Sequence, residues 1–183
     1  MSTTDVMRAI FYSGTHSFAV SEELIREIAF LVDEKYLRYT EFPISTKEEY
    51  LEQIETISRK GHYDADGGSV AHIALKRLAA AYVSRTHRKK VRFEAPFCGY
   101  YPDVLSVDQK LVVECGQTSN PDKMLAYFSA GNITECIQIP YPDVDNANVQ
   151  AYSFTAGDDL KDFLKAVESR RYASLKSLII RRR

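Results

Sequence analysis

The chain has 183 residues, of which 45% are apolar and 27% charged, and its formal net charge is −1. These values are ordinary for a globular protein and exclude a bulk polycation, while three widely spaced cysteines argue against a disulfide framework or a zinc knuckle. No apolar run approaches the roughly 20 residues of a membrane span, and the first residues lack the apolar core of a signal peptide, so we expect a cytoplasmic protein with no membrane partner.

The first third of the chain predicts helices. Residues 21–36 place acidic residues in a first turn and then apolar residues at helical spacing. Residues 45–59 repeat this pattern, and Ser69 is a suitable cap for a third helix over residues 69–86. We therefore expect residues 1–60 to form a helical N-terminal appendage.

The second half changes to short segments rich in β-branched and aromatic residues, which predict strands: VRFEAPF, DVLSV, KLVVEC and ECIQIPY. A helix is expected over 120–130, with Pro121 at its first position, and a last helix begins near Gly157. The expected fold class is α/β, with a small mixed β-sheet flanked by helices in residues 61–183.

Two of these strands form a predicted hairpin with a carboxylate at each outer end. If Asp108 and Gln109 lie at the tip of the hairpin, two residues face each other when their numbers sum to 217. This holds for a two-residue turn and also for a four-residue loop centred on the same point. Asp103 then lies directly opposite Glu114, with the Cβ atoms roughly 4.5–5.5 Å apart.

Like charges directly opposite each other destabilise a sheet, and burial increases the cost. A divalent cation between the carboxylates resolves the conflict, since Mg²⁺ is commonly held by one or two carboxylates together with waters and phosphates. The alternative is a solvated sheet edge, at which Asp103 merely starts one strand and Glu114 ends the other.

The segment PDV, a short hairpin, VVEC and a following helix together resemble the core of the PD-(D/E)XK nuclease superfamily, which has the restriction-endonuclease-like fold. The resemblance covers roughly residues 65–145. It implies a Mg- or Mn-dependent nuclease in which Asp103 and Glu114 bind the metal, together with the backbone carbonyl of Cys115. It also implies DNA as the partner and leaves open a homodimer, because cutting two strands needs two sites.

The chain departs from the family pattern at the lysine that normally follows the second acid by two residues, because Gly116 occupies that position. Two residues are candidates to position the attacking water in its place. Gln117 follows immediately, and Lys123 is expected in the first turn of the next helix, sharing a face with Tyr127.

A second departure concerns the acidic residue that many members carry on the first core helix. This chain has His72 there, and Glu94 in the strand before the hairpin is another candidate. Either one is a further possible metal ligand, and the alternative for each is a surface residue.

Five cations run from the end of the third helix into the first strand of the core, and we expect them to bind nucleic-acid phosphates: Arg85, Arg88, Lys89, Lys90 and Arg92. Two other functions stay open. The missing lysine is compatible with a nuclease fold that binds DNA without cutting it, and the helical N-terminus is compatible with a protein–protein interaction module.

Overall fold

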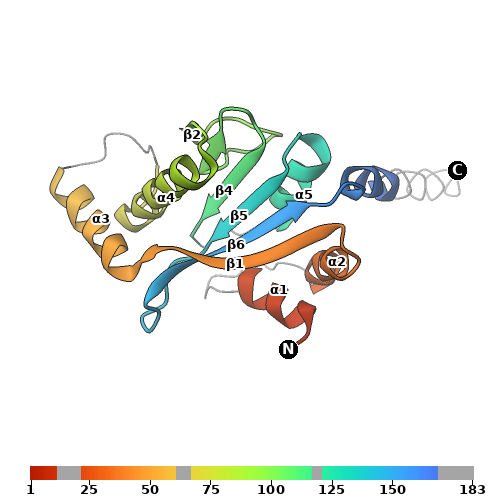
Figure 1. Cartoon of the computed structure of the whole chain (residues 1–183), viewed down its shortest axis with the longest axis horizontal. Helices are drawn as coiled ribbons and strands as arrows, with labels where there is room; N and C mark the ends of the chain where they lie inside the picture. Colours follow the sequence, from red (N-terminus) through yellow and green to blue (C-terminus); the bar gives the residue numbers. More distant parts are fainter. Residues whose placement is uncertain (12–21, 61–66, 117–120, 169–183) are drawn as a thin grey trace, which may run out of the picture.

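The computed structural model describes residues 1–11, 22–60, 67–116 and 121–168. Its centre is a six-stranded sheet in the order β1-β6-β5-β4-β3-β2 (Figure 1). β4 and β5 are parallel, and the other neighbouring pairs are antiparallel. The expected α/β fold with a mixed sheet between helices is confirmed.

The elements follow one another along the chain with helices and strands interspersed. The helices are α1 Thr3–Phe11, α2 Glu22–Asp33, α3 Lys47–Lys60, α4 Val70–Tyr82, the π-helical turn η1 Val83–His87, α5 Pro121–Ala130, and a helix that begins at Leu160 and runs to the last described residue, 168. The strands are β1 Leu37–Thr46, β2 Val91–Phe93, β3 Val104–Ser106, β4 Leu111–Cys115, β5 Glu135–Ile139 and β6 Asn148–Ala156.

The sheet separates two apolar cores, which makes the molecule a three-layer structure. α3 and α4 cover one face, where Val104 and Val113 are buried. α1, α2, α5 and the helix from Leu160 cover the other, where Leu105 and Val112 are buried. The alternation along β3 and β4 is the period of two that a strand imposes on its side chains.

The predicted hairpin register is confirmed. Val104 pairs with Val113 and Leu105 with Val112, so that paired numbers sum to 217. Residues 107–110 form the loop. Ser106 closes it, since its carbonyl accepts a hydrogen bond from the Gln109 amide and its hydroxyl accepts one from the Leu111 amide. Extending the same register places Asp103 opposite Glu114.

The helical N-terminal appendage is wrong in two respects. Residues 37–46 form β1, which pairs with β6 along its length, and α1 and α2 bury Met7 and Ile28 in the same core as Leu105. The described residues among 1–60 thus supply helices to both faces of the sheet and one of its edge strands. The sequence did not predict this strand, because the strand contains polar residues and Pro43. Proline is tolerated here since β1 is an edge strand and Pro43 lies at a register shift.

The other expected helices lie close to their predicted places. Ser69 caps α4 by accepting the amide of His72 at 3.2 Å, and Pro121 is the first residue of α5. In the part of the chain that the structure describes, no helix is long and apolar enough to cross a membrane.

Candidate functional site

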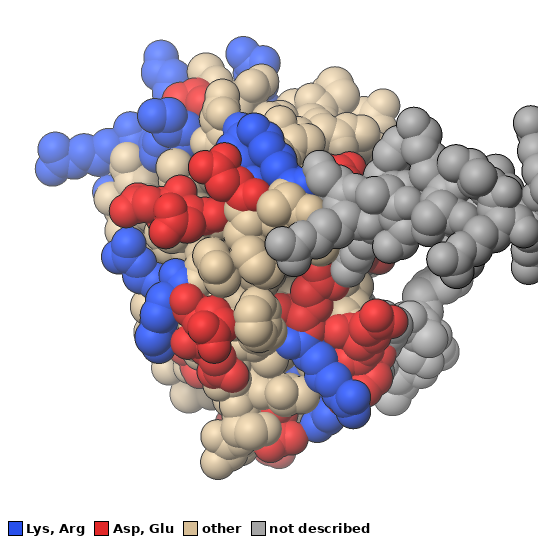
Figure 2. Space-filling view, turned by 90° about the vertical axis from the view of Figure 1, so that its right-hand side faces the viewer, with Lys and Arg blue, Asp and Glu red and all other residues tan. Residues whose placement is uncertain are grey.

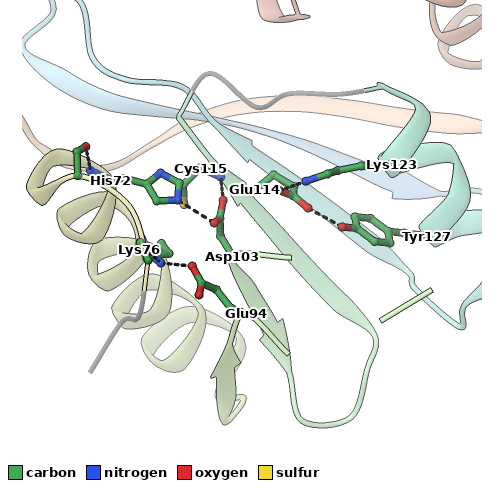
Figure 3. A network of polar contacts seen from close by, with 10 residues as sticks. His72, Lys76, Glu94, Asp103, Glu114, Cys115, Lys123 and Tyr127 are labelled. Carbon is green, nitrogen blue, oxygen red and sulfur yellow. Dashed lines mark hydrogen bonds and ion pairs between the residues drawn. The ribbon is translucent and has the colours of Figure 1, made fainter. Parts of the chain in front are cut away.

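The two carboxylates of the hairpin lie at the same end of β3 and β4 and are both buried (Figure 3). Asp103, directly before β3, is 7% exposed, and Glu114, in β4, is 3% exposed. The Asp103 carboxylate is directed toward α4 and the Glu114 carboxylate toward α5. The solvated sheet edge is therefore excluded for both residues, because neither side chain is open to water.

Asp103 is held by one side chain and one backbone amide. The His72 Nε2 atom lies 2.9 Å from Oδ1, and the Cys115 amide donates to Oδ2 at 2.7 Å. His72 is in the first turn of α4, just after the Ser69 cap. The aspartate thus joins α4 to the end of β4.

Glu114 is held from α5. The Tyr127 hydroxyl donates to Oε1 at 2.6 Å, and the Lys123 ammonium lies 3.4 Å from Oε2. Burial raises the pKa of Glu114 to about 7, and the negative charge of Asp103 adds to this shift, while Lys123 and Tyr127 oppose it. Ionisation of Glu114 is therefore disfavoured chiefly by burial, and a cation beside it would favour the ionised form.

The donor set suits a hard divalent cation. Two carboxylates supply oxygen ligands, and water and substrate phosphates commonly complete such a shell. The Cys115 amide points to the Asp103 side of β4, and the N–H and C=O of one strand residue point the same way, so its carbonyl also faces the aspartate. Among the described residues, no three His, Cys, Asp or Glu side chains gather into a metal site.

Gly116 has a conformational reason to be glycine. Its φ is +80°, and a Cβ atom there would lie 2.9 Å from ring carbons of Tyr141. A lysine at this position would be strained and would collide with that ring. Lys123 does reach Glu114, as the sequence indicates, whereas Gln117 lies outside the described residues.

Glu94, the other candidate metal ligand, is already engaged, because its Oε1 atom forms an ion pair with Lys76 at 2.6 Å. Lys76 is fully buried, and sequence reasoning missed it. The available signal was its spacing, since four residues after His72 it shares the helix face of that histidine.

Of the five cations, Lys89 and Lys90 lie at the loop end of the hairpin, while Arg92 lies in β2 opposite Leu105. The Lys90 carbonyl accepts the amide of Val107, and Lys89 pairs with Asp108 in the hairpin loop. From Ser106 to Asp103 the strand rises about 10 Å. The structure thus joins Asp103 to His72 on α4 and Glu114 to Lys123 and Tyr127 on α5, and Lys89 and Lys90 lie apart from both at the hairpin loop.

The surface charge is mixed. On the face in Figure 2, which looks onto the side of α2 and α5, acidic and basic residues alternate over the described part. A large single-sign field, which would draw a polyanion from a distance, does not cover the described part of that face.

Comparison of the chain with protein-family models, with curated proteins and with solved structures found no match. A function for this chain therefore rests on the geometry of the site.

Proposed function

We propose that the protein is a metal-dependent nuclease that hydrolyses phosphodiester bonds of DNA. The observation that carries this proposal is the pair of buried carboxylates, Asp103 and Glu114, at the open end of one hairpin. The register sets the two residues opposite each other, and the Asp103 charge disfavours ionisation of Glu114, so a nearby cation would stabilise both carboxylates. The order of helix, hairpin, helix and strand around them is also the one that the nuclease resemblance implies.

Asp103, Glu114 and the Cys115 carbonyl would hold Mg²⁺ or Mn²⁺, with His72 as a further candidate ligand once it leaves Asp103. Such a cation polarises a phosphoryl oxygen and lowers the pKa of bound water. Lys123, whose ammonium already lies at Glu114, positions the attacking water, with Gln117 as the alternative.

Tyr127 holds Glu114 in place by its hydrogen bond. Arg85, Arg88, Lys90 and Arg92 are exposed. With Lys89 they would bind phosphates, those at the hairpin loop distant from the scissile one. Such contacts give salt-dependent affinity without sequence readout.

A second function is a nuclease fold that binds DNA without cutting. Both Asp103 oxygens have hydrogen-bond partners within the protein, and a carboxylate satisfied in this way has a structural use without any metal.

The test incubates the protein with plasmid, single-stranded and branched DNA in Mg²⁺ or Mn²⁺, beside Asp103→Ala and Glu114→Ala. The matched control is Asp143→Ala, because Asp143 stands in a second Tyr-Pro-Asp-Val and is exposed. We expect both site variants to lose at least about 100-fold in rate, which corresponds to about 2.7 kcal/mol, and the control to cleave normally.

Salt-dependent binding without cleavage in either metal would refute the nuclease and leave the DNA-binding function. Neither binding nor cleavage would leave a protein–protein interaction module. Size measurement of the active species decides whether it is a homodimer.

A further inference from the structure

Lys76 is a lysine with no exposed surface, in the middle of α4. Taking an ammonium out of water is strongly unfavourable unless charge and hydrogen bonds compensate. Its Nζ atom donates to Glu94 Oε1 at 2.6 Å and to the Gly67 carbonyl at 2.9 Å. A buried cation with such partners fixes the segments that supply them.

Glu94 is the residue at which the chain leaves β2. Its φ is +47°, a left-handed conformation that is unfavourable for a non-glycine residue and persists only where the surroundings hold it. Its amide donates to the Asp103 carbonyl at 3.4 Å. The conformation of Glu94 therefore sets where the β2 end meets Asp103.

α4 contacts these two acidic residues through two side chains one helical turn apart. His72 bonds Asp103 and Lys76 bonds Glu94 (Figure 3). The register of β2 with β3 puts Glu94 opposite Asp103, since Phe93 pairs with Val104. Like charges directly opposite are unfavourable, and the Lys76 ammonium offsets that repulsion.

The glycine pair before α4 makes room for both contacts. A Cβ atom on Gly67 would lie 3.0 Å from Glu94 Oε1, and one on Gly68 would lie 2.6 Å from the His72 ring. Both glycines also have positive φ. Side chains at these positions would displace the carboxylate and the imidazole, so the backbone here is shaped around the two contacts.

We propose that Lys76 and Glu94 are positioning residues for the Asp103 carboxylate. The ion pair fixes the exit of β2, which in turn fixes Asp103 beside Cys115. Its effect on metal binding rests on the proposed nuclease function, whereas its effect on Asp103 does not.

The experiment compares Lys76→Met, Glu94→Gln and the double variant with the unaltered protein. Methionine keeps the volume of the buried stem without its charge, and the double variant removes both charges, so that no unpaired ion stays buried. Arg8→Met is the matched control, because the Arg8–Glu22 ion pair joins α1 to α2, away from the site. Circular dichroism selects folded variants.

The first readout needs neither metal nor DNA. The Cys115 amide donates to Asp103, so its hydrogen exchange, followed by NMR, reports the position of the carboxylate. We expect exchange at Cys115 to speed up at least about 10-fold in either single variant, while the Val113 amide keeps its rate. The double variant should change no more than a single one, because the two residues act as a unit.

The second readout is Mn²⁺ affinity without DNA, followed by kcat and KM. We expect Mn²⁺ dissociation constants to rise about 10- to 100-fold, as for residues that orient metal ligands, and kcat to fall while KM for DNA stays constant.

Unchanged Cys115 exchange in both single variants, or additive changes in the double variant, would overturn the proposal whatever the metal data show. If the unaltered protein binds no Mn²⁺ and cuts no DNA, the nuclease function fails, and Cys115 exchange still decides whether Lys76 and Glu94 position Asp103.

Discussion

The tetrapeptide Tyr-Pro-Asp-Val occurs at Tyr101–Val104 and again at Tyr141–Val144, and the two copies have opposite fates. Val104 is fully buried as the first residue of β3, whereas Val144 is 89% exposed in the connection between β5 and β6. The Asp-Val half of the tetrapeptide thus enters the core in the first copy and stays exposed in the second. The residues that come next along the chain decide the difference.

The aspartates differ in the same way. Asp103 is buried between His72 and the Cys115 amide, while Asp143 is exposed. The first copy runs directly into β3, and the register with β4 sets Glu114 opposite Asp103, whereas the second copy is followed by a connecting loop before β6 begins. A short acidic motif therefore indicates a site only when the register brings it a partner.

The largest expected effect on stability comes from replacing Glu114, the acid opposite Asp103. The pKa of Glu114 in the folded protein is about 7, above the ordinary value of 4.5. As pH rises, Glu114 ionises in the unfolded chain before it ionises in the folded protein. Its contribution to stability is therefore fully present below about pH 4.5 and is lost progressively as pH rises to about 7. Glutamine is neutral at every pH. The unfolding free energy of Glu114→Gln, relative to that of the unaltered protein, should therefore be roughly 3 kcal/mol higher above pH 7 than below pH 4.5.

Urea unfolding of both proteins at pH 4.5 and pH 8 measures this change. A difference that is the same at both pH values would show that Glu114 is not held in its neutral form by the fold.

The buried valine gives the next effect. Val104→Ala should cost about 2 kcal/mol of unfolding free energy, because two buried methyl groups are lost and a cavity is left. Val144→Ala should stay within about 0.5 kcal/mol, as exposed substitutions do. Equal losses, measured by thermal or urea unfolding, would break the comparison between the two tetrapeptides.

The smallest expected effect concerns the contact between Gly116 and Tyr141. The Tyr141 ring, from the second tetrapeptide, lies against Gly116 at the end of β4. Gly99 has the same φ of +80° with nothing within 4 Å of its Cβ position. Gly99→Ala should cost roughly 1 kcal/mol for the left-handed backbone, and Gly116→Ala roughly 1 kcal/mol more for the contact. Gly116→Lys should likewise lose stability and gain no activity.

Unfolding measurements on the two alanine variants isolate the contact with Tyr141. Equal costs would mean that backbone conformation alone excludes a side chain at Gly116.

Much of the fold could be predicted from local patterns. The hairpin register followed from counting about Asp108 and Gln109, because a strand period of two leaves few alternatives. β1 could not be predicted in this way, since its polar residues and Pro43 resemble a loop and its stability comes from pairing with β6. Strand pairing over more than a hundred residues leaves no local signal.

The sequence by itself determined the α/β class, the Asp103–Glu114 pairing and the contact of Lys123 with Glu114, because each depends on spacing within one or two neighbouring elements. Tertiary structure alone decided that both carboxylates are buried, that Lys89 and Lys90 lie at the loop end of the hairpin, and that Lys76 pairs with Glu94. Those outcomes depend on how α4 and α5 pack against the sheet, and packing between distant segments is set by the whole core and by no single stretch of residues.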